Sequence, residues 1–212
     1  MAARRIIVGL TGASGALYFL RTVRALLVLG HQVDAVMSKF GLLTLREETG
    51  VDVPVAELGR ALLERYGPDI QRGVLRIHGH QDQSASIASG SAKVDGMVVV
   101  PCSMKTLSGI AHGSAQNLIE RAADVCLKER RPLVLVPREA PMSLIHLRNM
   151  VLAAEAGAAI VPASPAYYQK PQTFDDLGDF IAARALSLLG VEEDLFPRWN
   201  GLSGEEDSEP TR

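Results

Sequence analysis

The sequence predicts an open α/β fold with a mostly parallel sheet and helices on both faces. Short, nearly continuous Val/Ile-rich runs alternate along the chain with longer amphipathic stretches. Runs that are apolar throughout are typical of parallel strands covered on both faces, and their alternation with helices indicates a doubly wound sheet. The strand candidates are residues 6–10, 33–37, 97–100, 133–136 and 158–161, with a further short candidate at 75–77. The helix candidates are residues 15–29, 39–48, 56–66, 106–111, 115–129, 144–155 and 175–189.

Length and composition predict one domain. The chain has 212 residues, of which 47% are hydrophobic, and this is enough for a single core. We expect the domain to span residues 1–202 and the polar, acidic tail at 203–212 to be disordered. Trp199 precedes that tail, and an aromatic side chain there needs a surface to cover it. The domain itself or a neighbouring subunit could supply this surface, so we interpret residues 190–201 as an oligomer-contact segment.

Charge and hydropathy exclude several classes of protein. The net charge of −2 gives no support for a nucleic-acid partner, because such proteins usually carry a basic surplus. No run of about 18 apolar residues is present that could cross a membrane. The basic and then apolar N-terminus soon meets Thr11 and Gly12, so we interpret it as the first strand of a cytoplasmic protein. Cys102 and Cys126 lack the spacing of metal ligands or of a disulfide framework.

Polar side chains follow five of the predicted strands. In open α/β sheets, ligands bind outside the carboxyl ends of the strands. Helix capping would account for the hydroxyls alone, but an Arg–Glu pair between two prolines favours a shared site. The residues that follow the five strands are Ser14; Ser38 and Lys39; Ser103, Met104, Lys105 and Thr106; Arg138 and Glu139; and Tyr167 and Tyr168.

The loop after the first strand is rich in glycine. Gly9, Gly12 and Gly15 form a G-x-x-G-x-x-G pattern, and a glycine turn that opens a helix lets backbone N–H groups approach a phosphate. The dinucleotide fingerprint G-x-G-x-x-G is absent, and no Tyr is followed four residues later by Lys, as in short-chain dehydrogenases. These departures favour a mononucleotide over NAD.

Two charged patterns have simpler structural explanations. Residues 175–179 read D-D-L-G-D, like the Mg²⁺-binding motif of helical prenyl-diphosphate enzymes. Thr173 can cap a helix there, and acidic residues in a first turn complement the helix dipole, so capping is favoured. Within 115–129, a polar stripe of Asn117, Arg121, Asp124 and Lys128 is either a solvated face with ion pairs or the wall of an anion site. Spacing alone favours the solvated face.

Six longer segments occur in a characteristic order over residues 5–200: VGLTGASGA, SKFG, PCSMKTLSGIAHG, NLIERAADVCLKERRPLVLVPREAP, IHLRNM and PASPAYYQKP. In these motifs the chain resembles the UbiX-type flavin prenyltransferases, within the homo-oligomeric flavin-binding decarboxylase-like superfamily. The resemblance implies a Rossmann-like or flavodoxin-like domain that assembles as a dodecamer with its active sites where subunits meet. It also implies a reaction between reduced FMN and dimethylallyl phosphate, without a metal, which gives prenylated FMN for a UbiD-type decarboxylase.

The resemblance also implies roles for individual residues. The FMN contacts it implies are Gly12, Ala13, Ser14, Ser38, Ser103, Met104, Lys105, Thr106 and Arg138. The donor-phosphate contacts it implies are Tyr168 and Arg184, completed by Arg121, Lys128 and Glu139. Trp199 matches an aromatic residue near the site.

The chemistry of the reaction suggests which groups move protons. Glu139 is a candidate to protonate the leaving phosphate or to accept a proton, and a carboxyl beside several cations suits the role of base better. Ser14 could relay protons at flavin N5, and Glu48 is a second candidate base. The sequence does not rank the two carboxylates, and for Glu139 an ion pair with Arg138 or Arg184 is the structural alternative.

Three other functions are alternatives to a flavin prenyltransferase. An FMN-dependent cysteine decarboxylase of the same superfamily would need an asparagine where Ser143 stands, and His146 reads as a helix residue rather than a base. A flavin-binding protein without chemistry would need fewer cations than this chain carries. An NAD oxidoreductase is disfavoured by the glycine loop.

Overall fold

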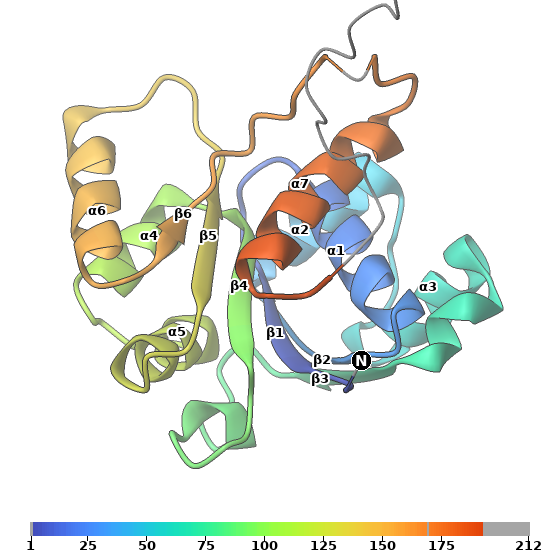
Figure 1. The fold of residues 1–212 in the computed structure, drawn as a ribbon, viewed down its shortest axis with the longest axis horizontal. Helices are drawn as coiled ribbons and strands as arrows, with labels where there is room; N and C mark the ends of the chain where they lie inside the picture. The colour runs from blue at the N-terminus through green and yellow to red at the C-terminus, as the bar shows by residue number, and fades with distance from the viewer. Residues whose placement is uncertain (1, 169, 193–212) are drawn as a thin grey trace, which may run out of the picture.

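A single sheet of six parallel strands organises the computed structural model, which describes residues 2–168 and 170–192 (Figure 1). The strand order is β3-β2-β1-β4-β5-β6, and every neighbouring pair is parallel. Trp199 and the predicted tail at 203–212 lie outside the described residues. The strands are β1 (Arg5–Leu10), β2 (Gln32–Met37), β3 (Val74–His78), β4 (Gly96–Cys102), β5 (Leu133–Pro137) and β6 (Ala159–Ile160).

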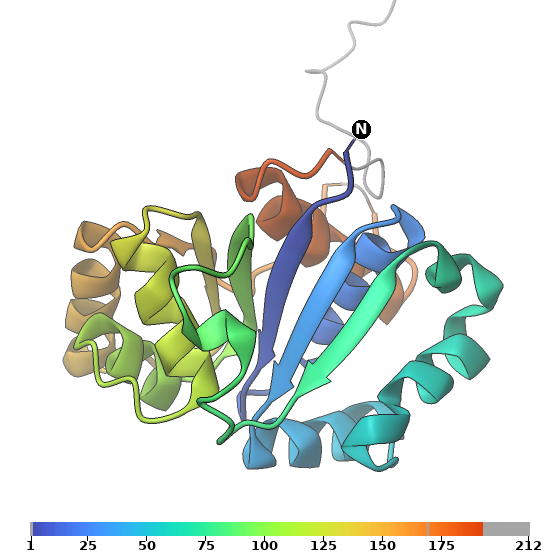
Figure 2. The same cartoon turned by 90° about the horizontal axis from the view of Figure 1, so that it is seen from below.

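Helices cover both faces of the sheet (Figures 1 and 2). The α-helices are α1 (Ala16–Val28), α2 (Lys39–Thr49), α3 (Leu58–Tyr66), α4 (Met104–Ala111), α5 (Leu118–Lys128), α6 (Leu144–Glu155) and α7 (Phe174–Leu188). Short 3₁₀ segments are η1 (Val55–Glu57), η2 (Pro68–Arg72) and η3 (Ser86–Ala88). The predicted α/β class with a parallel sheet and helices on both faces is confirmed.

The apolar strands supply two cores because successive side chains point to opposite faces. On one face, Ile6 and Val8 of β1 pack with Phe19 of α1 and Ile181 of α7. On the other face, Ile7 packs in a cluster with residues of α4, α5 and α6. This two-sided burial explains why the strands read as unbroken apolar runs.

Several predicted boundaries differ from the observed ones for local reasons. The helix expected at 115–129 begins at Leu118, because the Asn117 side chain caps it by accepting a hydrogen bond from the Glu120 N–H, and Ala115 has φ 47°. The helix expected at 106–111 begins earlier, at Met104, because Ser103 is its N-cap. The strand expected at 158–161 is only two residues long.

The strand order reverses between β1 and β4, since the chain proceeds outward from β1 to β2 and β3 on one side and through β4, β5 and β6 on the other. This is the Rossmann order, and without the edge strand β3 it is the flavodoxin order. The edge where the strands end is therefore the expected binding crevice. None of the helices in the described ranges is long and apolar enough to cross a membrane.

Candidate functional site

The glycine loop at residues 11–15 joins β1 to α1 at the reversal point. A Cβ at Gly12 would lie 2.5 Å from the Cβ of Phe40, so only glycine lets the first turn of α2 pack against this loop. Gly15 is the N-cap of α1 with φ 111°, and no side chain at that position caps the helix. The loop therefore leaves the first N–H groups of α1 open to an acceptor from elsewhere.

Glu48 supplies this acceptor from the last turn of α2. Its Oε2 accepts hydrogen bonds from the N–H groups of Gly15, at 2.9 Å, and Ala16, at 2.8 Å. A carboxylate at a helix N-terminus is stabilised by the helix dipole and by the free N–H donors. The structure thus brings the predicted base Glu48 to the glycine loop, more than thirty residues away in sequence.

The serines that follow β2 and β4 cap the next helices. The Ser38 Oγ accepts from the Gly41 N–H at 3.0 Å, and the Ser103 Oγ accepts from the Thr106 N–H at 3.3 Å. The capping interpretation is therefore correct for both residues, and both also lie at the carboxyl edge of the sheet. Next to them, Lys105 is exposed, with its Nζ 3.9 Å from the buried Glu120 carboxylate.

Tyr18 on α1 is a site residue that the sequence analysis missed. Burial raises the pKa of its hydroxyl, nearby Tyr167 and Glu48 raise it further, and Arg138 lowers it. Side chains from three other segments, Glu48, Arg138 and Tyr167, therefore act on this hydroxyl. The clue in the sequence was an aromatic residue three positions after Gly15. In the structure the Tyr18 ring packs against this glycine, since a Cβ added at Gly15 would lie 2.8 Å from the ring.

Glu139 follows β5 beside Arg138. Its Oε1 accepts a hydrogen bond from the Ala140 N–H at 3.0 Å. Arg138 is exposed and Glu139 half-buried. The carboxylate therefore has a local backbone donor, and the expected alternative of an ion pair with Arg138 or Arg184 does not appear among the ion pairs of the described residues.

A pocket of about 560 Å³ opens between the N-terminal ends of α1 and α7. Ser14 and Glu48 line it together with Tyr18 and Arg65. Its apolar walls are Leu17, Phe174 and Leu177. The pocket joins hydroxyl and carboxylate groups to an apolar surface, as a small amphipathic substrate requires. Arg65 and Phe174 were not predicted, because α3 and α7 reach this edge only through packing.

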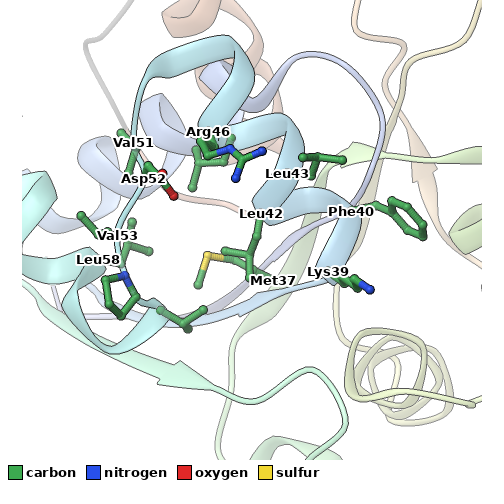
Figure 3. A pocket seen from close by; sticks show the side chains of 13 residues that line it. Met37, Lys39, Phe40, Leu42, Leu43, Arg46, Val51, Asp52, Val53 and Leu58 are labelled. Carbon is green, nitrogen blue, oxygen red and sulfur yellow. The ribbon is translucent and has the colours of Figure 1, made fainter.

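A second pocket, of about 450 Å³, lies beside α2 (Figure 3). Figure 3 shows Met37 and Leu42 within it and Lys39 and Phe40 at one end. Its walls are mostly apolar, and Lys39 is the one residue of the predicted strand-end set that lines it. None of the predicted flavin, phosphate or proton-transfer residues lines this pocket.

The structure of one chain does not bring all predicted phosphate contacts to this edge. Arg121 pairs with Asp124 at 2.8 Å and donates to the Ala88 carbonyl, as the solvated-face interpretation expects. Lys128 ends α5, which leads into the start of β5 at the opposite edge, and its Nζ lies 3.8 Å from Glu129 rather than near Asp124. Arg184 is exposed on α7, seven residues or roughly 10 Å beyond Leu177.

The aspartates at 175–179 are engaged with a side chain of α1. Arg21, which is 7% exposed, pairs with Asp175 and Asp179. Thr173 and Asp176 form a capping box at the start of α7. The capping interpretation is confirmed, and in the part of the chain described no group of three His, Cys, Asp or Glu residues is arranged to hold a metal. Likewise, His146 is a helix residue that forms a capping box with Ser143.

Comparison with known proteins agrees with this fold. A family profile described as Flavoprotein matches residues 1–186. The flavin prenyltransferase UbiX of Pseudomonas aeruginosa is 48% identical over 92% of this chain and 93% of its own length. The flavin prenyltransferase UbiX of Synechocystis is 43% identical over 96% of this chain and all of its own length.

Solved structures give the same result. AnUbiX (PadA1), crystallised in complex with FMN and dimethylallyl pyrophosphate, has a TM-score of 0.83 and 44% identity, covering 94% of this chain and 99% of that one. A dodecameric FMN-dependent UbiX-like decarboxylase from Escherichia coli O157:H7 has a TM-score of 0.81 and 42% identity, covering 93% of this chain and all of that one. The cypemycin decarboxylase CypD, at 14% identity and a TM-score of 0.58, shares the fold.

The parallel sheet, the glycine loop at its reversal point and the profile match define a flavoprotein of the Rossmann-like class. Within that class, the chain belongs to the UbiX flavin prenyltransferases.

Proposed function

We propose that the chain transfers the dimethylallyl group of dimethylallyl phosphate to N5 and C6 of reduced FMN and so makes prenylated FMN. The observation that carries this proposal is identity of 43–48% to flavin prenyltransferases over more than nine-tenths of the chain. The complex of a similar structure with FMN and dimethylallyl pyrophosphate supports a flavin and a dimethylallyl donor as the substrates. The glycine loop opens a helix and lacks the NAD fingerprint, so it fits a mononucleotide.

Reduced FMN would lie across the loops that follow β1, β2, β4 and β5. The proposed contacts are the residues predicted from the sequence: Gly12, Ala13, Ser14, Ser38, Ser103, Met104, Lys105, Thr106 and Arg138. Loop backbone donors, capping hydroxyls and one arginine at this edge suit a phosphate and a flat polar ring. The pocket that Ser14 and Glu48 line would hold the five-carbon chain against its apolar wall.

The reaction must neutralise a departing phosphate. The allylic C1–O bond breaks and its electron pair leaves on phosphate, while N5 bonds to C1 and releases its proton. C2 of the prenyl chain then gains a proton, prenyl C3 bonds to flavin C6, and flavin C6 releases its proton. Two protons are released, from N5 and C6, and one is taken up at C2, so one proton remains for the phosphate. Glu139, Ser14 and Glu48 are the proposed proton carriers. Preorganised cations and hydroxyls at the leaving group can each contribute about 3 kcal/mol.

A neighbouring copy of the chain would complete the phosphate site. Arg121 and Lys128 lie away from the glycine loop of their own chain, whereas Tyr168 and Arg184 are exposed. One face of α6 carries exposed apolar side chains, among them Leu144 at 60% and Ile145 at 68%, and a patch of this kind is typical of an interface. The dodecameric relative supports assembly into a dodecamer.

The remaining features of the proposal concern the whole chain. We propose one domain over residues 1–202, of which residues 193–202 lie outside the described ranges. The enzyme would work in the cytoplasm and pass its product to a UbiD-type decarboxylase.

An anaerobic reaction tests the proposed activity. The protein is mixed with reduced FMN and dimethylallyl phosphate, with dimethylallyl diphosphate in a parallel reaction, and the flavin is analysed by mass spectrometry. A flavin heavier by one C5 unit is expected, at the same yield with a chelator present. Unchanged flavin with both donors, but with FMN bound, would favour a non-catalytic flavin carrier. Oxidative decarboxylation of a peptidyl or pantothenoyl cysteine would instead favour the cysteine decarboxylase.

A further inference from the structure

Thr11 is the first residue after β1, and only 1% of it is exposed. Its Oγ1 donates a hydrogen bond to the Pro101 carbonyl at 2.8 Å and accepts one from the Ser103 N–H at 2.7 Å. Both bonds cross the point where the strand order reverses. A single side chain thus joins the glycine loop to the loop after β4.

In the described residues, backbone pairing between β1 and β4 does not extend to the point where Thr11 makes these bonds. The register between β1 and β4 runs from Ile6–Gly96 to Gly9–Val99 and stops there. The pairing between β4 and β5 is irregular between Val99 and Cys102. The Thr11 hydroxyl therefore links the two segments beyond the last paired residues of β1 and β4. A hydroxyl is suited to this link because it can donate one hydrogen bond and accept another at the same time.

This contact lies at the N-terminus of α4. Thr11 binds the backbone N–H of the N-cap residue Ser103. The Ser103 hydroxyl accepts from the Thr106 N–H at 3.3 Å and donates to the Thr106 Oγ1 at 3.1 Å. The first turn of α4 contains Met104 and Lys105. On the other side of Thr11, the chain continues directly into Gly12, Ala13 and Ser14.

We propose that Thr11 is a positioning residue for flavin: it sets the separation of the two loops between which FMN binds, without touching FMN itself. This inference rests on the proposed function, because it takes these loops to be the flavin site. Loss of the hydroxyl removes the partner of a buried carbonyl and of a part-buried N–H, and the two segments can move apart to reach water. Flavin affinity should then fall, because binding must first restore the spacing.

Two substitutions at Thr11 separate the hydroxyl from the shape of the side chain. Thr11→Val keeps the volume and removes both hydrogen bonds, and Thr11→Ser keeps the hydroxyl. We expect Thr11→Val to raise the Kd for FMN by about tenfold, which corresponds to one unpaired buried polar group, and Thr11→Ser to remain within about threefold. Oxidised FMN suffices for this titration, so the readout does not depend on turnover.

Thr22 provides a matched control. It is fully buried, and its Oγ1 donates to the Tyr18 carbonyl at 2.7 Å within α1. Thr22→Val should lower the melting temperature without changing the Kd for FMN. If Thr22→Val weakens FMN as much as Thr11→Val does, the effect is general destabilisation and the proposal is wrong.

Other outcomes also decide the question. A folded Thr11→Val with wild-type affinity would overturn the proposal. If Thr11→Val does not fold, Thr11→Cys takes its place, because a thiol is a weak donor and acceptor; it should weaken FMN, and unchanged affinity would likewise overturn the proposal. Failure of the wild-type protein to bind FMN would contradict the proposed function and not the loop contact itself.

Discussion

At the scale of single residues, the two candidate bases differ in their surroundings. Glu48 is held by two backbone N–H groups at the N-terminus of α1, whereas Glu139 accepts one hydrogen bond from the residue that follows it. Glu48 is therefore engaged in capping α1. The hydrogen bond of Glu139 is local to its own loop.

Glutamine substitutions should separate these roles. Glu139→Gln is expected to keep FMN affinity and to slow product formation by at least about tenfold, because an amide cannot exchange a proton. Glu48→Gln can still accept from Gly15 and Ala16, so α1 should remain capped. Single-turnover mass spectrometry on both variants ranks the bases by loss of rate, and wild-type turnover in Glu139→Gln would exclude that residue from the mechanism.

Gly12 should tolerate no side chain. Gly12→Ala places a methyl group 2.5 Å from the Cβ of Phe40, which must push α2 from the glycine loop, so FMN should bind at least about tenfold more weakly. Gly59→Ala is the control, since its new methyl group would meet only Leu75 at 3.8 Å. Calorimetric titration of both variants with FMN measures the difference, and equal affinities would show that α2 can move without affecting the site.

At the scale of elements, polar contacts of buried or partly buried charged side chains join segments that lie far apart in sequence. Arg21 joins α1 to α7 through Asp175 and Asp179. Asp34, which is fully buried in β2, binds Arg5 of β1 at 2.6 Å and His78 of β3 at 2.7 Å. These pairs use residues that appear as surface charges in the sequence, and breaking one partner of a buried pair typically costs about 3–5 kcal/mol.

The Asp34 network predicts a dependence of stability on pH. Burial alone would raise the pKa of Asp34, but hydrogen bonds from Arg5 and His78 outweigh it, so the pKa is lowered below 3.8. A lowered pKa in the folded state contributes stability above the unfolded value, and this contribution is lost as the pH falls through the folded value. Asp34→Asn should therefore unfold more readily than wild type at pH 7.

The difference in the free energy of unfolding between the wild type and Asp34→Asn should become smaller as the pH falls below about 4. Urea unfolding of both proteins at several pH values measures this difference. A difference in the free energy of unfolding that stays constant down to pH 3 would mean that the Asp34 charge does not stabilise the sheet.

At the scale of the whole molecule, the active site proposed here requires more than one chain. The cations predicted to bind the donor phosphate are distributed over α5 and α7 rather than around one glycine loop. Contacts between copies would bring them together, and the exposed apolar face of α6 is the surface best suited to such contacts.

A charge on α6 tests this arrangement. Ile145→Asp should reduce the oligomer to smaller species, because an aspartate buried in an apolar interface is strongly unfavourable, and donor-dependent turnover should fall with it. Leu29→Asp is the control, since that leucine is 41% exposed at the end of α1. Light scattering after gel filtration gives the masses, and an unchanged oligomer in Ile145→Asp would place the interface elsewhere.

The sequence by itself determined the class of fold, and it predicted the edge at which the site is proposed to lie. Unbroken apolar runs and amphipathic stretches report local conformation and burial, so the strands and helices could be predicted, together with the loops at the carboxyl ends. Caps such as Asn117 shifted some boundaries because a side-chain hydrogen bond decides where a helix begins. Only the tertiary structure decided that Glu48 reaches α1, that Tyr18 faces the site and that Thr11 joins two loops, because contacts between distant residues depend on how the elements pack and leave no periodic signal in the chain.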